Sequence, residues 1–368
     1  MARDSDQCRS TAVNFIVMTS PFRRYVVISF VAVFFLVGIV FYRYDSSSLP
    51  SFPQVKHGPL RSSGDASLQQ VLQFIYNPTK FSLTSPAFET DGRRYELPDD
   101  HHYTSPLGKD VCILDVDTRP FENKGQVFHE GNFDWDKQEP YTGGILNHYT
   151  YAQIHGYDYH FINAANYTDR HATWIKPSAI ANILHSYKFV IFLDADATFA
   201  NPEIPIEWLL NYWSIDPSVS LAMALDPPKP TNNDTMGRRY SNTGFIIAQN
   251  NPRTFEILKV WDDCPNDIRY PGCSEWKKPR FHEQSAFGTY VRYDYDEWIK
   301  ELPCDEANGE PDGEDCRGVF ISHWWWRTNQ VGTSFGDMTM KKVMGRLHGA
   351  VIDEKHKIVE VQKDNKIQ

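Results

Sequence analysis

Residues 189–196 read Phe-Val-Ile-Phe-Leu-Asp194-Ala-Asp196, and they are the clearest indication of the fold class. Its first five residues are apolar without interruption, which is typical of a central parallel strand that is buried on both faces. Two carboxylates follow immediately, one residue apart. Because ligands of an open α/β sheet bind beyond the carboxyl ends of its strands, we expect Asp194 and Asp196 to face a ligand.

Strand-like and helical segments alternate on both sides of this stretch. We expect strands at 111–114, 157–161, 219–225 and 245–248, and helices at 144–155, 177–187 and 254–261. Gly156 ends the first of these helices, and Pro177 opens the second. The alternation predicts the α/β class, with a mostly parallel central sheet flanked by helices.

The carboxylate pair Asp194 and Asp196 has three interpretations. Its hard oxygen ligands suit Mn²⁺ or Mg²⁺, and such a cation stabilises a diphosphate leaving group. The residues Asp194-Ala-Asp196-Ala-Thr198 also satisfy the haloacid-dehalogenase phosphatase pattern, in which Asp194 is a nucleophile. Third, an aspartate after a strand is common in plain turns. For the protein as a whole, a lumenal sugar-binding protein without catalytic activity is a further alternative.

The segment 25–42 carries no charged residue, and Arg23 and Arg24 precede it. As a helix it spans about 27 Å, enough for a thin bilayer. The basic flank predicts a cytoplasmic N-terminus and a lumenal C-terminal part, as in a single-pass type II membrane protein. A cleaved signal peptide is the alternative, but the run is long for one and no small-residue cleavage site follows.

The domain organisation follows from this topology. We expect a cytoplasmic tail at 1–24, a transmembrane signal anchor at 25–42, a lumenal stem at 43–109, a globular domain at 110–354 and a polar C-terminal tail at 355–368. The stem is rich in Ser, Pro and Asp, but it contains one helical stretch at 67–76.

Composition excludes one class of partner. The chain of 368 residues has a net charge of −10, and no basic cluster is dense enough to hold a nucleic acid backbone. Two sequons, at Asn166 and Asn233, agree with a lumenal location, where both can be glycosylated.

Four cysteines form two close pairs in polar loops. An oxidising lumen allows Cys264 with Cys273, and Cys304 with Cys316, to form local disulfides, although spacing alone does not settle the connectivity. Cys112 lies in an apolar run and is interpreted as a small core residue. Zinc is a weak competitor because the sequence has no Cys-x-x-Cys motif.

Three blocks of sequence, taken in order, resemble glycosyltransferase family 34. They are Asn147-His-Tyr-Thr-Tyr-Ala-Gln-Ile-His-Gly-Tyr-Asp-Tyr159, Trp174-Ile-Lys-Pro177 and Leu193-Asp-Ala-Asp-Ala197, and the similarity covers about Val111 to Arg327. This family includes fungal Golgi α-galactosyl- and α-mannosyltransferases and is related to plant xyloglucan xylosyltransferases. The resemblance implies a GT-A type nucleotide-diphospho-sugar transferase fold for residues 110–354. It also implies a nucleotide-sugar donor of the UDP-galactose or GDP-mannose type, a glycan or glycoprotein acceptor, retention at the anomeric carbon, and location in the Golgi membrane.

The same resemblance implies roles for individual residues. The implied metal ligands are Asp194, Asp196 and His323; the implied donor-binding residues are Asp115, Thr118, Trp174, Lys176, Asp194, Asn242 and Gly244; and the implied catalytic residues are Glu283, Gln284 and Arg327. Ordinary structural explanations stand beside these roles. Asp115 and Thr118 also fit plain turn chemistry, Glu283 fits a helix start, and Gly244 fits a turn.

The sequence departs from the family pattern after His323. Three tryptophans and a basic residue, Trp324-Trp-Trp326-Arg327, stand where the family usually has Phe, Gly and then a basic residue or Pro. The guanidinium of Arg327 suits a diphosphate. The tryptophans fit either a wall that stacks on sugar or core packing.

Overall fold

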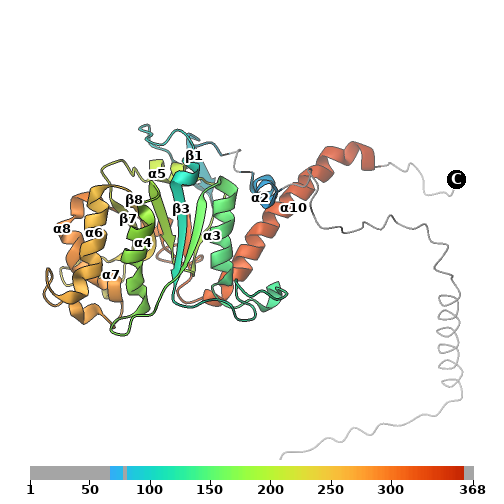
Figure 1. The fold of residues 1–368 in the computed structure, drawn as a ribbon. Helices are drawn as coiled ribbons and strands as arrows, with labels where there is room; N and C mark the ends of the chain where they lie inside the picture. The colour runs from blue at the N-terminus through green and yellow to red at the C-terminus, as the bar shows by residue number, and fades with distance from the viewer. Residues whose placement is uncertain (1–66, 78–80, 360–368) are drawn as a thin grey trace, which may run out of the picture. The chain divides into compact units, whose positions relative to one another are not determined.

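The computed structural model describes residues 67–77 and 81–359. Residues 66–368 form one compact unit, in which helices lie on both sides of a central sheet (Figure 1). The expected cytoplasmic tail, the expected transmembrane segment 25–42 and the first part of the stem lie outside the described residues. Within 67–77 and 81–359, no helix has the length and apolar character needed to cross a membrane.

Six strands form the central sheet. In spatial order they are β4 (Asp158–Asn163), β3 (Val111–Asp117), β5 (Phe189–Leu193), β8 (Ser241–Gln249), β7 (Leu221–Leu225) and β9 (Ile299–Leu302). Only β8 among them is antiparallel to its neighbours, β5 and β7. The predicted α/β class with a mostly parallel sheet is therefore confirmed.

Each face of the sheet has its own hydrophobic core, because alternate strand residues point to opposite faces. Ile113 and Ile191 belong to the core that includes residues of α3 and α5. Leu114 and Phe192 belong to the opposite core, with residues of α4 and α6. The helices are α3 (Thr142–His155), α4 (Lys176–Leu184), α5 (Ile206–Tyr212), α6 (Pro252–Asp263), α7 (His282–Ala286) and α8 (Arg292–Asp294).

The helix boundaries around the sheet follow the signals in the sequence. Gly156 ends α3 in the left-handed conformation, with φ of 74°, which a residue without a Cβ adopts at little cost. Pro177 lies in the first turn of α4, where its missing N–H is not needed. Both helices therefore lie where the sequence predicts them, beside the strand that ends at Leu193.

A second, two-stranded sheet lies next to the end of β5. It pairs β6 (Ala197–Phe199) with β10 (Ile321–His323) in antiparallel fashion, and His323 stands opposite Ala197. Because β6 begins one residue after Asp196, this register brings a histidine from the end of the chain beside the carboxylate pair.

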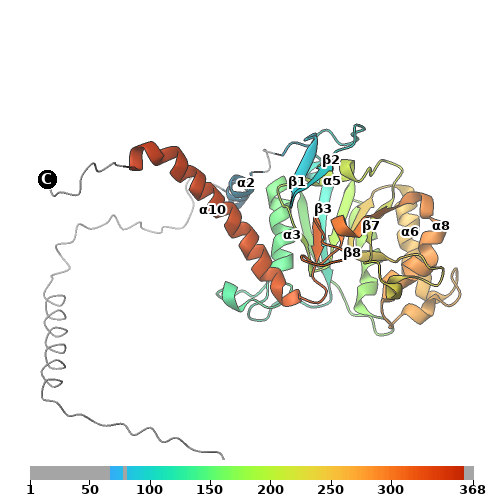
Figure 2. The same cartoon turned by 180° about the vertical axis from the view of Figure 1, so that it is seen from behind.

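The segment expected to form a stem belongs in part to the folded unit. It contributes α2 (Leu68–Tyr76), β1 (Ala87–Thr90) and β2 (Arg93–Glu96), and Tyr76 and Tyr95 are buried. The helix expected within the stem at 67–76 is present as α2, and these elements belong to the same compact unit as the sheet. Helix α10 (Val331–Ile358) lies beside α2 (Figure 2) and extends into the expected polar tail.

Both expected disulfides are present in the structure. Cys264 is bonded to Cys273, and Cys304, the first residue of α9 (Cys304–Ala307), is bonded to Cys316. Cys112 is a buried free thiol inside β3, as predicted for a core residue. The Cys304–Cys316 bond joins α9, which follows β9, to the segment that leads into β10.

Candidate active site

Asp194 and Asp196 lie in the tight loop between β5 and β6. The backbone N–H of Asp194 donates to the carbonyl of Gly244 at 2.8 Å, which fixes the loop against β8. On its other side the loop rests on the start of α3, where Gly144 lies so close to the carbonyl of Ala195 that a Cβ would collide with it. Glycine at position 144 therefore lets the helix support the carboxylate loop directly.

His323 completes the group. Its Nε2 lies 3.2 Å from Oδ1 of Asp196, and its Nδ1 lies 3.0 Å from Oδ1 of Asn308. The backbone N–H of Trp324 donates to the carbonyl of Asp196 at 2.9 Å, so the histidine strand and the carboxylate loop are bonded to each other. The imidazole lies against Gly244, where a Cβ would come 2.8 Å from Nδ1.

These three side chains fit a divalent cation. One ligand atom from each of Asp194, Asp196 and His323 lies within 4.8 Å of the others. Burial raises the pKa of Asp194 against the effect of Lys176, and the charge of Asp196 raises it further. For Asp196, burial also favours a higher pKa, but the nearby His323 outweighs it, so that the pKa is lowered. A cation between the two carboxylates would relieve their repulsion, and oxygen and imidazole ligands suit Mn²⁺.

Lys176, the first residue of α4, is a buried cation between two carboxylates. Its Nζ lies 2.9 Å from Oδ1 of Asp194 and 3.2 Å from Oε1 of Glu283, and only 4 % of the residue is exposed. Burial acts to lower the pKa of Lys176, but the two carboxylates outweigh it and raise the pKa. The ammonium group is therefore charged at neutral pH and tied directly to the carboxylate pair.

Glu283 and Gln284 come from α7 and contact β8. The hydroxyl of Thr243 donates to Oε1 of Glu283 at 2.9 Å, and the N–H of Thr243 donates to Oε1 of Gln284 at 3.2 Å. The sequence analysis expected this strand to begin at residue 245. In the structure β8 begins at Ser241, so Asn242, Thr243 and Gly244 lie within its first half. Their backbone is thus held by the sheet as well as by α7.

Asp226 is a site residue that the sequence analysis missed. It directly follows β7 and accepts hydrogen bonds from Nδ2 of Asn242 at 2.9 Å and from Nε2 of Gln284 at 2.7 Å. Burial raises the pKa of Asp226, against the effect of these hydrogen bonds. Its position directly after a buried strand is the same signal that pointed to Asp194.

Asp115 lies inside β3 rather than in the turn after it, and only Thr118 lies beyond the strand. Both carboxylate oxygens of Asp115 have protein partners: Nδ1 of His148 at 2.8 Å and the hydroxyl of Tyr159 at 2.6 Å. The other nitrogen of His148 donates to the carbonyl of Ala197 at 2.8 Å. Asp115 therefore supports the carboxylate loop through His148, a buried residue that sequence reasoning did not single out.

Trp174 and Arg327 are engaged elsewhere in the fold. The indole of Trp174 is fully buried, and its Nε1 donates to the carbonyl of Trp276 at 3.2 Å. Arg327 pairs with Glu310 at 3.5 Å and donates to the carbonyl of Pro311. The structure thus places Trp174 in a hydrophobic core and joins Arg327 to the loop at 310–312.

The three consecutive tryptophans have three different environments. Trp324 is buried, and its Nε1 donates to the hydroxyl of Thr198 at 3.2 Å. The ring of Trp325 lies 4.9 Å from that of His323, centroid to centroid. Trp326 is 73 % exposed. The run is therefore neither a single stacking wall nor a single block of core.

The family comparison identifies the chain as a glycosyltransferase. Residues 128–298 match the family model of the galactosyl transferase GMA12/MNN10 family, glycosyltransferase family 34. The resemblance deduced from the sequence is thereby confirmed. His323 and Arg327 lie beyond the matched residues, so the place of His323 beside the carboxylates rests on the geometry.

Solved glycosyltransferase structures are also similar to this chain. One is a glycosyltransferase involved in the glycosylation of the major capsid of PBCV-1, with 16 % identity, a TM-score of 0.44, and coverage of 61 % of this chain and 98 % of that one. Another is mouse xyloside xylosyltransferase 1 in its apo form, with 14 % identity, a TM-score of 0.35, and coverage of 61 % and 99 %. No curated protein matches the chain.

Proposed function

We propose that this protein is a metal-dependent glycosyltransferase with a GT-A type fold. It transfers a hexose from a nucleotide-sugar of the UDP-galactose or GDP-mannose type to a glycan or glycoprotein acceptor, with retention at the anomeric carbon. The observation that carries the proposal is the meeting of Asp194, Asp196 and His323, with ligand atoms within 4.8 Å, beside the buried cation of Lys176.

In this proposal Asp194, Asp196 and His323 hold Mn²⁺ or Mg²⁺, which supplies positive charge to the leaving diphosphate. Lys176 adds a fixed charge on the same side. Arg327, the alternative cation, is joined to the loop at 310–312, whereas Lys176 lies directly beside the proposed metal ligand Asp194, so Lys176 takes this role.

The remaining residues serve the transferred sugar. Gly244 and Asn242 lie on β8 beside the carboxylates, and the missing Cβ of Gly244 leaves room for the imidazole of His323. Glu283 stabilises positive charge that develops at the anomeric carbon, and Gln284 lies next to it, near the acceptor. Retention requires attack from the face of the leaving group, and the leaving phosphate accepts the proton of the acceptor hydroxyl, so no separate base is assigned.

The test is to incubate the full-length protein, purified in detergent, with a panel of nucleotide-sugars and Mn²⁺ and to measure released nucleotide. We expect one donor to be turned over, activity to disappear with EDTA, and Asp194→Asn to be inactive but folded. Asp263→Asn, which changes an exposed carboxylate on α6, is the matched control and retains activity. Full activity of Asp194→Asn, or turnover that EDTA does not affect, would contradict the metal site.

The same preparation separates the alternative functions. A haloacid-dehalogenase-like phosphatase that uses Asp194 as nucleophile would hydrolyse a generic phosphate ester such as p-nitrophenyl phosphate and ignore nucleotide-sugars. A sugar-binding protein without catalytic activity would release no nucleotide from any donor. Metal-dependent release of nucleotide excludes both.

We also propose that the protein is a single-pass type II protein of the Golgi membrane, with residues 25–42 as its anchor and the catalytic unit in the lumen. The two disulfides support this location because they persist in oxidising compartments. Asn166 and Asn233, the two sequon residues, are both exposed. Loss of mass on treatment with an endoglycosidase, abolished in the double variant Asn166→Gln/Asn233→Gln, tests it; complete protease sensitivity of the catalytic unit in sealed vesicles would refute it.

A further inference from the structure

Asn308 lies directly behind His323, on the side away from the carboxylates. It follows α9 and is 1 % exposed. Its Oδ1 lies 3.0 Å from Nδ1 of His323, and its Nδ2 donates to the carbonyl of Leu225 at 3.1 Å. Neither the family resemblance nor the sequence motifs pointed to this residue.

The contact with Leu225 determines the chemistry of the contact with His323. A backbone carbonyl only accepts hydrogen bonds, so the NH₂ group of Asn308 must face Leu225 and its Oδ1 must face the imidazole. An amide oxygen also only accepts, so Nδ1 of His323 must carry a proton and donate it. In the neutral imidazole, the lone pair then lies on Nε2, the nitrogen that faces Asp196.

We propose that Asn308 is a positioning residue that holds His323 in the one tautomer and ring orientation able to bind the cation. The proposal rests on the metal site of the proposed function. Metal-binding histidines generally donate their second ring N–H to an acceptor of this kind, and loss of that acceptor typically weakens metal binding 10- to 100-fold.

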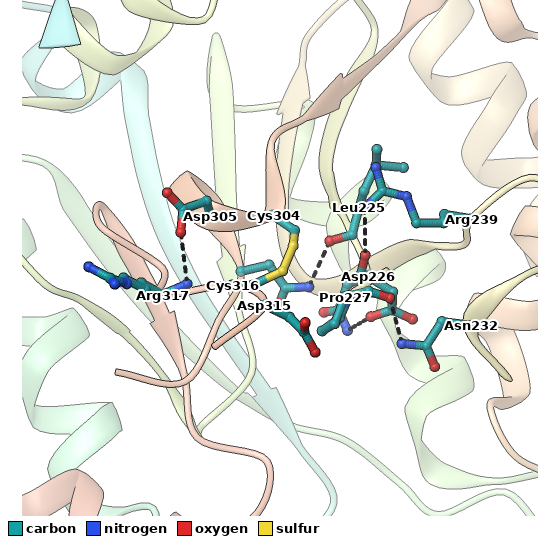
Figure 3. The surroundings of a disulfide bond; sticks show 12 residues. Leu225, Asp226, Pro227, Asn232, Arg239, Cys304, Asp305, Asp315, Cys316 and Arg317 are labelled. Atoms are coloured by element: carbon teal, nitrogen blue, oxygen red, sulfur yellow. Dashed lines mark hydrogen bonds between the residues drawn. A yellow bond between two sulfur atoms is a disulfide. The ribbon is translucent and has the colours of Figure 1, made fainter. Parts of the chain in front are cut away.

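The loop that carries Asn308 is fixed independently of the metal. The disulfide between Cys304 and Cys316 closes it, and Figure 3 shows that bond next to Leu225 and Asp226. The carbonyl of Gly309 accepts the backbone N–H of His323 at 2.8 Å, so the loop holds both the backbone and the ring of the histidine. Asn308 is thus placed before any cation arrives, which is what a positioning role requires.

The adjacent residue Asp226 shows that this support extends to the rest of the site. It follows Leu225, the residue whose carbonyl orients Asn308, and it holds Asn242 and Gln284. The end of β7 therefore orients the residues behind the metal ligand and the residues near the sugar together.

The test measures binding of Mn²⁺ alone to the full-length protein, from the signal of free Mn²⁺ in electron paramagnetic resonance. Asn308→Ala should raise the Kd for Mn²⁺ by about 10- to 100-fold. Asn308→Asp keeps an acceptor opposite Nδ1, so its Kd should stay within about threefold of the wild type, well short of that loss. The matched control is Asn211→Ala, which removes an equally buried asparagine whose amide bonds only backbone atoms of residues 102 and 103.

Each outcome tests either the positioning role of Asn308 or the metal site of the proposed function. An unchanged Kd in Asn308→Ala overturns the positioning role, and so does a loss in Asn211→Ala as large as that in Asn308→Ala, because a general loss of packing would then explain both. If Asn308→Ala does not fold, Asn308→Asp decides: a Kd close to that of the wild type supports the role, and a 100-fold increase overturns it. Failure of the wild type to bind Mn²⁺, or undiminished binding by Asp194→Asn, would instead refute the proposed function.

Discussion

Gly244→Ala places a methyl group against the imidazole of His323. The added Cβ would lie 2.8 Å from Nδ1 and 2.9 Å from Nε2, and nearer still to the carbon between them. Ordinary contacts of this kind need about 3.4 Å or more, so the ring must retreat by more than about 0.5 Å. Metal–ligand distances tolerate only about 0.2 Å, so the histidine can no longer bind the cation in its place.

We expect Gly244→Ala to lose at least tenfold in Mn²⁺ affinity, about 1.4 kcal/mol, and to need correspondingly more Mn²⁺ for nucleotide-sugar turnover. The assay is a Mn²⁺ titration of released nucleotide, with thermal unfolding recorded on the same sample. Gly345→Ala makes the same chemical change on α10, where nothing lies within 4 Å of the new Cβ, and serves as the control. Wild-type Mn²⁺ dependence in folded Gly244→Ala would refute the place given to His323.

Two further predictions concern buried ionisable side chains. Lys176→Met leaves Glu283 buried without its cation and should lower the free energy of unfolding by about 3–5 kcal/mol. Adding Glu283→Gln should restore part of this in a denaturant titration, and no recovery would contradict the ion pair. Burial lowers the pKa of His155, which contacts the carbonyl of Pro202 at 2.7 Å, to about 4. The unfolded chain, with a pKa near 6.5, therefore binds this proton first, and stability falls as the pH drops from about 6.5 towards 4. Between pH 7 and pH 5, protonation of His155 in the unfolded chain should lower the free energy of unfolding by about 2 kcal/mol. The variant His155→Gln should lack this decrease. Equal loss of stability in both proteins between pH 7 and pH 5 would contradict the prediction.

The central strands could be predicted because their signals are local. Phe189–Leu193 is a strand with the predicted bounds, since a buried strand needs only a short apolar run. The reversed direction of β8 could not be read from its sequence, because direction depends on how the chain returns to the sheet. The β1–β2 pair was not predicted for a related reason: it lies in a polar segment that packs against the core through Phe88 and Tyr95, whereas α2 matches the helix expected at 67–76.

For the site, too, features marked by neighbouring residues could be predicted, but contacts between segments far apart in the chain could not. Asp194 and Asp196 follow a recognisable strand, and Lys176 was found through the family resemblance. Asp226 carried the same strand-end signal, but nothing local connects it with Asn242 or Gln284. For Arg327, the sequence gives its chemistry but not its neighbours, and its partner Glu310 lies on a separate loop.

The pairing of β6 with β10 has a consequence for the order in which the site forms during synthesis on the ribosome. Asp196 and His323 are separated by more than a hundred residues of chain, which the ribosome adds one after another. An unfinished polypeptide that already contains the aspartates still lacks the strand that delivers the imidazole. In the proposed metal site, the third ligand is therefore added only late in synthesis, and we expect a product truncated before β10 to be inactive even where its sheet has formed.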